Sequence, residues 1–153
     1  MLTILWLAFI YSNSLKTGVE SGEQSGRAFQ FINSITDFLG FDKPISENFI
    51  RKAAHFIEFA VLSALICVDA WAFGFVSFKK KLSTSVISLF LSVPISAVFA
   101  SIDELLQNFS DGRAPSVVDI LIDSSGALTA CILCILLFCL LYHVKKSKRE
   151  EKY

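Results

Sequence analysis

The chain has 153 residues, of which 54% are hydrophobic, and its formal net charge is zero. Its mean hydropathy of +0.59 is well above that of soluble domains, and the apolar residues are clustered into long runs. These totals exclude an ordinary soluble domain, and they give no basic field that would indicate nucleic-acid binding. They predict an all-α, polytopic membrane helix bundle with a single domain, about four transmembrane helices and one amphipathic interfacial helix.

The first predicted element is a short apolar segment. Residues 2–11 would cover about 15 Å as a helix, which is roughly half of a bilayer core. No basic residue precedes this segment and no small-residue cleavage site follows it. We therefore interpret residues 1–12 as a first span with a shortened start rather than as a signal peptide, and the polar residues Ser12, Asn13 and Ser14 mark its exit.

The next segment begins polar and rich in serine and glycine. From Ala28 to Leu39 apolar residues then recur at helical spacing. This pattern predicts an amphipathic helix that stops at Gly40. A helix lying on the membrane surface and a helix packed over the mouth of the bundle both fit it.

Three longer spans follow. We expect the second span at residues 46–76, with Ser46 as the N-cap of its helix. The third span is expected at residues 82–107, where Pro94 should kink the helix. The fourth span is expected at residues 117–143, and a basic tail covers residues 144–153.

Basic residues set the predicted orientation of the spans. Three lysines occupy the short loop at residues 79–81, and the tail carries basic residues at 145, 146, 148 and 149. The positive-inside rule places both segments on the cytoplasmic side of the cell membrane. The connector that contains Arg113 then faces outside, together with the nearby ends of the three later spans.

Polar residues gather at these outer ends. Within each span they repeat at intervals of three or four residues, which places them on one helix face. The sets are Arg51, His55 and Glu58 on the second span, Asp103, Glu104 and Gln107 on the third, and Asp119, Asp123 and Gly126 on the fourth. The glycine would let a neighbouring helix approach closely. We expect the sets to form one polar site with Arg113. The alternative is a polar collar of caps and ion pairs that holds the bundle together.

Two kinds of chemistry suit such a site. The candidate catalytic residues are His55, Glu58, Asp103 and Glu104, because an imidazole or paired carboxylates can act as general acid and base. A divalent ion such as Mg²⁺ or Ca²⁺ would fit the oxygen ligands better than Zn²⁺ would, but the single histidine on this face leads us to assign no metal ligand. Asp69 lies deeper along the second span and either carries a proton there or reaches water at the cytoplasmic end.

The four cysteines all lie in apolar runs. Cys131 and Cys134 have the C-x-x-C spacing, but no second pair accompanies them. We therefore interpret the cysteines as small core residues rather than as a redox or metal motif.

The polar sets resemble the VanZ-like family. Its members combine an Arg-Lys-x-x-His-x-x-Glu start of one span with a later Asp-Glu-x-x-Gln, Gly-Arg and Asp-x-x-x-Asp block, and residues 51–58 and 103–123 carry both patterns. Residues 9–14 also look like the serine-bearing end of the family's first helix. The ligand-binding positions carried over by the resemblance are Arg51, His55, Glu58, Asp103, Glu104, Gln107, Arg113, Asp119 and Asp123. Leu106 departs from the family, because many members have histidine or tyrosine there, and Phe59 stands where tyrosine is frequent.

The resemblance implies a multi-pass protein of the cell membrane, and the namesake of the family is linked to low-level resistance to the glycopeptide teicoplanin. We expect a cell-envelope protein, surrounded by the lipid bilayer and without a nucleic-acid partner. Its outward-facing polar site would bind an amphiphilic or lipid-linked ligand, such as a lipoglycopeptide or a cell-wall precursor. One alternative is a membrane-embedded acid/base or metal-dependent enzyme acting on a lipid-borne ester or phosphate. Another is a structural helper of a larger membrane complex.

Overall fold

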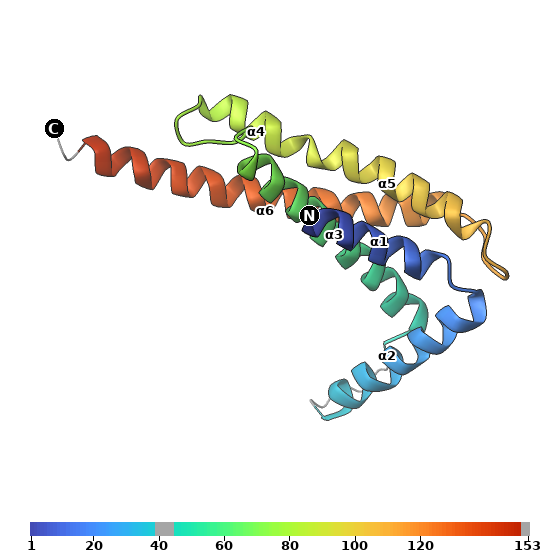
Figure 1. The fold of residues 1–153 in the computed structure, drawn as a ribbon. Helices are drawn as coiled ribbons and strands as arrows, with labels where there is room; N and C mark the ends of the chain where they lie inside the picture. Colours follow the sequence, from blue (N-terminus) through green and yellow to red (C-terminus); the bar gives the residue numbers. More distant parts are fainter. Residues whose placement is uncertain (39–44, 151–153) are drawn as a thin grey trace.

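The computed structural model describes residues 1–38 and 45–150, and within these ranges the chain forms helices and no strands. The helices are α1 (Leu2–Ser14), α2 (Gly18–Phe38), α3 (Glu47–Ala72), α4 (Leu82–Phe90), α5 (Ser92–Gln107) and α6 (Val117–Glu150). The predicted all-α fold is confirmed (Figure 1).

Three segments are long and apolar enough to cross a membrane, namely Glu47–Ala72, Leu82–Gln107 and Val117–Lys148. α1 is a shorter apolar helix. The protein is therefore a multi-pass membrane helix bundle. Its described residues contain three helical segments of spanning length and the shorter apolar helix α1, where about four spans were expected.

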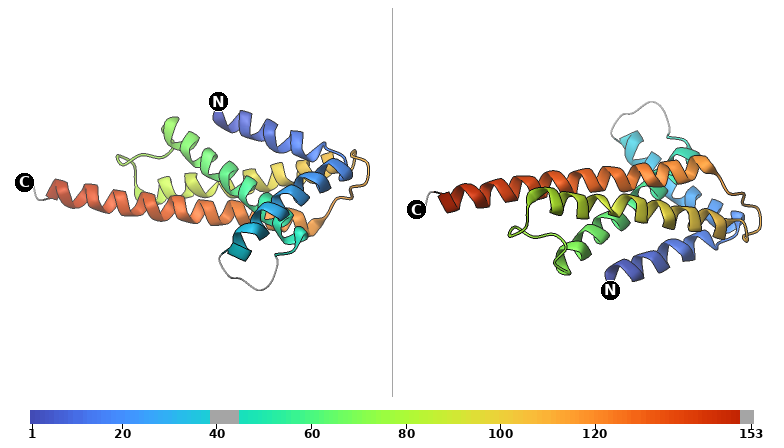
Figure 2. Two further views of the ribbon diagram at one scale, coloured as in Figure 1. Left: turned by 90° about the horizontal axis from the view of Figure 1, so that it is seen from below. Right: turned by 90° about the horizontal axis from the view of Figure 1, so that it is seen from above.

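The helices fall into three directions, with α4, α5 and α6 side by side, α1 and α3 inclined to them, and α2 projecting from one end (Figures 1 and 2). α6 is the longest helix, and α4 and α5 run beside it while α3 crosses it (Figures 1 and 2). α3 and α6 form the most extensive helix pair, α1 packs against α3 and α5, and α2 packs against α3. The α1–α2 turn and the α5–α6 connector lie at one end of the bundle, while the α3–α4 connector and the end of α6 lie at the other (Figure 1).

The close contact between α3 and α6 is centred on Gly126. A Cβ atom at this position would lie 2.1 Å from the backbone oxygen of Phe56, far inside van der Waals contact. Only a residue without a side chain allows the two backbones to approach in this way. The predicted role of this glycine as a point of close helix approach is confirmed.

α2 begins at Gly18, ten residues before the expected apolar periodicity. Glu20 explains the early start, because its Oε2 atom accepts hydrogen bonds from the backbone N–H and the hydroxyl of Thr17, and Thr17 Oγ1 accepts one from the backbone N–H of Glu20. This is a capping box, and the same hydrogen bonds lower the pKa of Glu20. The stop expected at Gly40 lies outside the described residues.

The other helix ends have local causes. Ser46 caps α3 as expected, since its hydroxyl accepts from the backbone N–H of Phe49. α3 ends at Ala72 and not at residue 76, because Gly74 adopts a φ of 77° and turns the chain back onto the carbonyl of Ala70. α6 continues through the basic residues to Glu150 instead of ending at residue 143.

The third span consists of two helices, α4 and α5, separated at Leu91. Pro94 accounts for the break, because it has no N–H to donate to the carbonyl four residues earlier, and its ring clashes with that carbonyl. The expected proline distortion is therefore present, as an interruption of the helix. Next to the break, the carbonyl of Leu89 is approached by the thiols of Cys67 and Cys131 at 3.8 and 3.5 Å.

Two buried clusters hold the bundle together. Ile10, Phe59, Leu62 and Ala100 join α1, α3 and α5 near the end that carries the polar residues. The second cluster joins α3, α4 and α6 at the other end and consists of Cys67, Val76, Leu89 and Phe138. All four cysteines are free thiols, and Cys67 and Cys131 are buried, as expected for small core residues.

Replacing Gly126 with alanine should destabilise the bundle, because the added methyl group must push α3 away from α6. Overpacking of this kind costs about 1–3 kcal/mol, which exceeds the gain of at most about 1 kcal/mol in helix propensity. Thermal unfolding of the protein in lipid nanodiscs measures the effect as a lower melting temperature.

The matched control is Gly26→Ala in α2, where an added Cβ meets no atom within 4 Å. This variant should melt at the same temperature as the unchanged protein or slightly higher. Equal stability of both alanine variants would contradict the close-contact account of Gly126.

Candidate functional site

Asp103 occupies the centre of a buried polar network between α1, α5 and α6. Its side chain is fully buried. Ser14, the last residue of α1, donates its hydroxyl to Asp103 Oδ1 at 2.6 Å, and Gln107 donates its side-chain amide to Oδ2 at 3.2 Å. The two donors fix the orientation of the carboxylate, because one oxygen is held from α1 and the other from the last turn of α5.

Glu104 has a different role from its neighbour. Its Oε2 atom accepts the backbone N–H of Ser116 at 2.7 Å, and its Oε1 atom accepts the amide of Gln107 at 3.1 Å. Ser116 in turn caps the first turn of α6 by accepting from the backbone N–H of Asp119. Glu104 therefore ties the end of α5 to the start of α6, and both its oxygens are engaged in that contact.

His55 and Asp123 face each other across the α3–α6 contact. The imidazole Nδ1 lies 3.7 Å from Asp123 Oδ1, and the carboxylate is fully buried. Neither the Nδ1 atom nor either Asp123 oxygen has a hydrogen-bond partner in the structure. His55, Asp103 and Asp123 each offer one ligand atom within 4.8 Å of the other two.

Glu58 lies one turn along α3 from His55 and meets α1 instead. Asn13 donates its side-chain amide to Glu58 Oε1 at 3.1 Å, and the indole N–H of Trp6 donates to the backbone oxygen of Glu58 at 2.9 Å. The His55-x-x-Glu58 pair considered from the sequence therefore divides between two surroundings. His55 turns towards the aspartates, and Glu58 turns towards α1.

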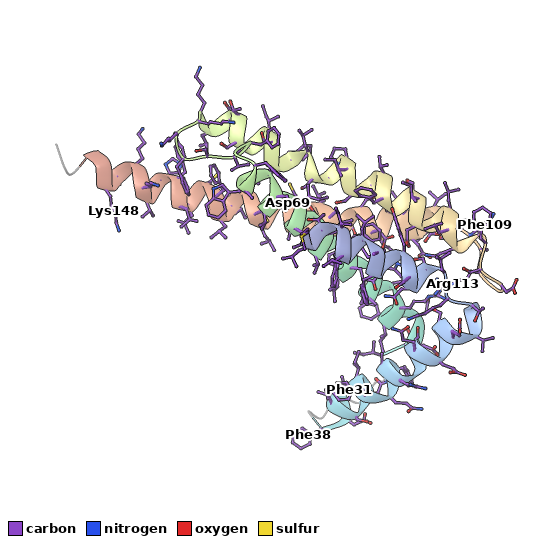
Figure 3. The ribbon with its side chains drawn as sticks, viewed as in Figure 1. Phe31, Phe38, Asp69, Phe109, Arg113 and Lys148 are labelled. Carbon is purple, nitrogen blue, oxygen red and sulfur yellow. The ribbon has the colours of Figure 1, made fainter. Side chains whose placement is uncertain are left out.

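Arg113 joins the α5–α6 connector to the turn between α1 and α2. Its guanidinium donates to the backbone oxygen of Ser14 at 3.2 Å and to the hydroxyl of Ser21. The connector is held in addition by Ser110, which donates to the same Ser14 oxygen, and by the backbone N–H of Gly18, which donates to the carbonyl of Asp111. In Figure 3 Arg113 lies against the beginning of α2.

A cavity of about 130 Å³ opens between α1, α2 and α3. Its polar lining includes Arg51, His55 and Glu58 from α3 and Arg113 from the connector. Asn13 and Ser14 line it from α1, and Ser21, Gln24 and Ser25 line it from α2. Arg51 is exposed, and its guanidinium donates to the side-chain oxygen of Asn48.

Eight of the nine predicted site residues fall into three groups. Four line the cavity, namely Arg51, His55, Glu58 and Arg113. Asp103 and Asp123 lie behind it with His55, while Glu104 and Gln107 belong to the joint between α5 and α6. Asp119 is half-buried, one turn before Asp123. It belongs neither to the cavity lining nor to the triad formed by His55, Asp103 and Asp123.

Residues of α1 and α2 are the part of the site that the sequence patterns did not identify. Asn13 and Ser14 hold Glu58 and Asp103, although they were expected only to mark the exit of the first span. The signal that pointed towards them was the serine-bearing end of the first helix, at residues 9–14. Ser21 carried no signal, because a single serine in a serine-rich segment has no periodic context.

Asp69 lies outside this region. It accepts a hydrogen bond from the hydroxyl of Thr3 near the start of α1. Figure 3 shows it well away from Arg113 and towards the other end of the bundle. It therefore links α1 to α3 in the part of the bundle remote from the cavity.

Comparison with known protein families matches residues 1–139 to the family model described as VanZ/LLP1. The matched region contains every residue of the cavity and of the buried network. Searches among curated proteins and among solved structures found no match.

Glu104→Ala should destabilise the bundle, because it removes the acceptor of both the Ser116 N–H and the Gln107 amide. A buried donor left without a partner costs about 1–3 kcal/mol. The melting temperature in nanodiscs should fall clearly. Asp111→Ala is the control, since this exposed residue contributes only its backbone carbonyl to a recorded contact. Equal melting temperatures for the two variants would contradict the structural role of Glu104.

Proposed function

The chain belongs to the VanZ-like family, and we propose that it is a cell-envelope protein whose cavity binds the anionic headgroup of an amphiphilic or lipid-linked ligand. The observation that carries the proposal is the presence of two arginines, Arg51 and Arg113, at one cavity. They come from α3 and from the α5–α6 connector, so the fold brings together two positive charges that are far apart in sequence.

The electrostatics of the cavity favour an anion. Burial, followed by repulsion from Arg51, lowers the pKa of Arg113, yet a guanidinium remains protonated at any physiological pH. Two neighbouring guanidiniums are stabilised when a phosphate or carboxylate lies between them, because both can donate charge-assisted hydrogen bonds to it. Glu58, the nearest acid in the lining, is already bound by Asn13.

The size of the cavity restricts what can enter it. At about 130 Å³ it is smaller than the 300–1,000 Å³ typical of pockets that enclose a drug-sized ligand. A phosphate or a similar small headgroup is compatible with this volume. A second hollow of about 340 Å³ shares Ser21, Ser25 and Arg51 with the cavity and leaves room for a larger headgroup beside it. Of the ligands considered, we favour a lipid-linked cell-wall precursor, because such a ligand carries an anionic headgroup on an apolar chain.

The apolar part of such a ligand would remain outside the cavity. α2 exposes Phe31, Ile35 and Phe38 at intervals that place them on one helix face, and Phe38 is 89% exposed. Exposed apolar residues on a helix beside a membrane bundle are typical of helices that lie in the lipid interface. In Figure 3 Phe31 and Phe38 extend along α2 away from Arg113, so a headgroup at Arg113 would have its acyl chain beside lipid.

We expect a long-chain alkyl phosphate to bind the protein more tightly than the alcohol of the same chain length. Arg51→Ala should weaken binding of the phosphate about tenfold, because loss of one charge-assisted hydrogen bond costs about 1.5–3 kcal/mol. Native mass spectrometry of detergent-solubilised protein measures both affinities. Arg113→Gln should act in the same direction.

Arg27→Ala is the matched control, because Arg27 is an exposed arginine of α2 outside the cavity lining. Its alkyl phosphate affinity should equal that of the unchanged protein. Equal losses in Arg27→Ala and Arg51→Ala would attribute the effect to general surface charge and would overturn the proposal. In cells, Arg51→Ala at normal expression should also alter sensitivity to envelope-directed antibiotics, and Arg27→Ala should not.

An enzyme that acts on a lipid-borne ester or phosphate is the second candidate. The observation that favours it is His55, which lines the cavity while its Nδ1 faces Asp123. Such an imidazole has the surroundings of a general base. Of the other catalytic candidates, only Glu58 also reaches the cavity. If the unchanged protein hydrolyses an alkyl phosphate or a lipid ester and His55→Gln does not, the enzyme is favoured over a protein that only binds its ligand.

We further propose that the cavity faces the outside of the cell. The lysine loop at residues 79–81 and the end of α6 lie at the opposite end of the bundle from Arg113 (Figures 1 and 3). Basic residues concentrate on the cytoplasmic side of membrane proteins. This argument supports an extracytoplasmic α5–α6 connector.

Single-cysteine labelling in intact cells tests the orientation. Asp111→Cys, at an exposed position of the connector, should react with a membrane-impermeant maleimide. Lys80→Cys, also at an exposed position, should react only after the cells are permeabilised. The unchanged protein gives the background from its four native cysteines, and the reverse labelling pattern would show the opposite orientation.

A further inference from the structure

We propose that His55, Asp103 and Asp123 bind a divalent transition-metal ion behind the cavity. The three residues come from α3, α5 and α6, and each offers a ligand atom within 4.8 Å of the other two. Ligand atoms around a tetrahedral ion with bonds of about 2.1 Å are separated by roughly 3.4 Å. Side-chain rotations that bring these atoms together by little more than an ångström would therefore complete the site.

The hydrogen bonding of the triad indicates a missing partner. Asp123 is fully buried, and neither of its oxygens accepts a hydrogen bond. The Nδ1 atom of His55 also has no partner. Buried polar atoms are almost always satisfied in folded proteins, and a bound ion is one of the recognised explanations when they are not. The unpartnered atoms of His55 and Asp123 lie beside Asp103, and one cation between the three residues would account for them.

The charges of the region lead to the same conclusion. Asp103 and Asp123 bring two carboxylates into a fully buried space, and the buried Glu104 lies next to Asp103 in sequence. Arg113 donates its hydrogen bonds to Ser14 and Ser21, so it attracts Asp103 and Glu104 through its charge alone. A divalent cation would compensate both aspartates at once. Neighbouring carboxylates repel unless a cation or a shared proton compensates them.

The surroundings of Asp103 suit a metal ligand. Ser14 and Gln107 each hold one of its oxygens, so the carboxylate is oriented before any ion binds. Hydrogen bonds of this kind from residues around a site orient metal-binding carboxylates and maintain affinity. The remaining lone pairs of both oxygens are available for coordination.

The ligand set selects the class of ion. One imidazole and two carboxylates without a thiolate suit Zn²⁺, Mn²⁺ or Fe²⁺, whereas Mg²⁺ and Ca²⁺ prefer oxygen ligands alone. The site considered from the sequence combined His55 and Glu58 with the aspartates and favoured Mg²⁺ or Ca²⁺. In the structure Glu58 is bound to Asn13, which leaves His55 with the two aspartates. Three protein ligands leave a coordination position open. Of the three residues, His55 also lines the cavity.

Metal analysis of the full chain tests the proposal. The tag-free protein in nanodiscs is stripped with a chelator, incubated separately with Zn²⁺, Mn²⁺, Fe²⁺ under anaerobic conditions, or Mg²⁺, then desalted and analysed by mass spectrometry of the elements. We expect about one transition-metal ion per chain and at least tenfold less Mg²⁺. Cobalt(II) should in addition give visible absorption bands with the stripped protein.

Asp123→Asn and His55→Gln should each reduce the bound metal at least tenfold. Asp111→Asn is the control, because it removes an exposed carboxylate of the α5–α6 connector that does not belong to the triad, and it should retain the full metal content. Circular dichroism and size-exclusion chromatography identify the variants that fold, and two ligand variants keep the test decisive if one of them does not. Absence of stoichiometric metal in the unchanged protein, equal uptake of Mg²⁺, or full metal content in both folded ligand variants would overturn the proposal.

The proposal does not depend on headgroup binding. Loss of metal in Asp123→Asn without any alkyl phosphate binding by the unchanged protein would support the metal site and reject the ligand. Alkyl phosphate binding by a protein that takes up no metal would do the reverse.

Discussion

The contact between α3 and α6 at Gly126 is the constraint on which the polar region depends. Because the backbone of Phe56 lies against this glycine, the adjacent His55 is brought to 3.7 Å from Asp123, one turn earlier on α6. α5 packs against both helices and adds Asp103. A wider separation of α3 and α6 would part His55 from Asp123 and leave the Asp123 carboxylate without its neighbour, which is very costly inside a membrane. The polar cluster therefore requires close helix packing.

The acids at this end of the bundle serve different purposes despite their similar sequence context. Glu104 has both oxygens occupied and acts as a joint between two helices. Asp103 is oriented by Ser14 and Gln107, and Asp123 has no hydrogen-bond partner at all. From Glu104 through Asp103 to Asp123, the carboxylates are thus progressively less occupied by hydrogen bonds within the protein. Glu104 fits the polar collar weighed from the sequence, whereas the site interpretation of Asp103 and Asp123 stays a prediction.

Sequence patterns predicted the helices and the class of protein, because long apolar runs and three- or four-residue spacing depend on local chemistry. The gathering of Arg51, His55 and the later acids at one end followed from the order of the spans. What could not be predicted was the partner of each side chain. His55 and Glu58 share a face of α3, yet one meets α6 and the other meets α1. That choice depends on the angle at which the helices cross, which Gly126 and the Pro94 break set through tertiary packing.

The length of α6 has a consequence for the fit to the membrane. Its 34 residues extend for about 51 Å, whereas the hydrocarbon core of a bilayer is about 30 Å thick. The start of the helix is held by Glu104 and Ser116, and the excess length lies entirely at the other end, where the side chains are basic. Hydrophobic mismatch is then absorbed by the long lysine side chains at that end. The depth of the polar cluster should therefore stay nearly constant in bilayers of different thickness.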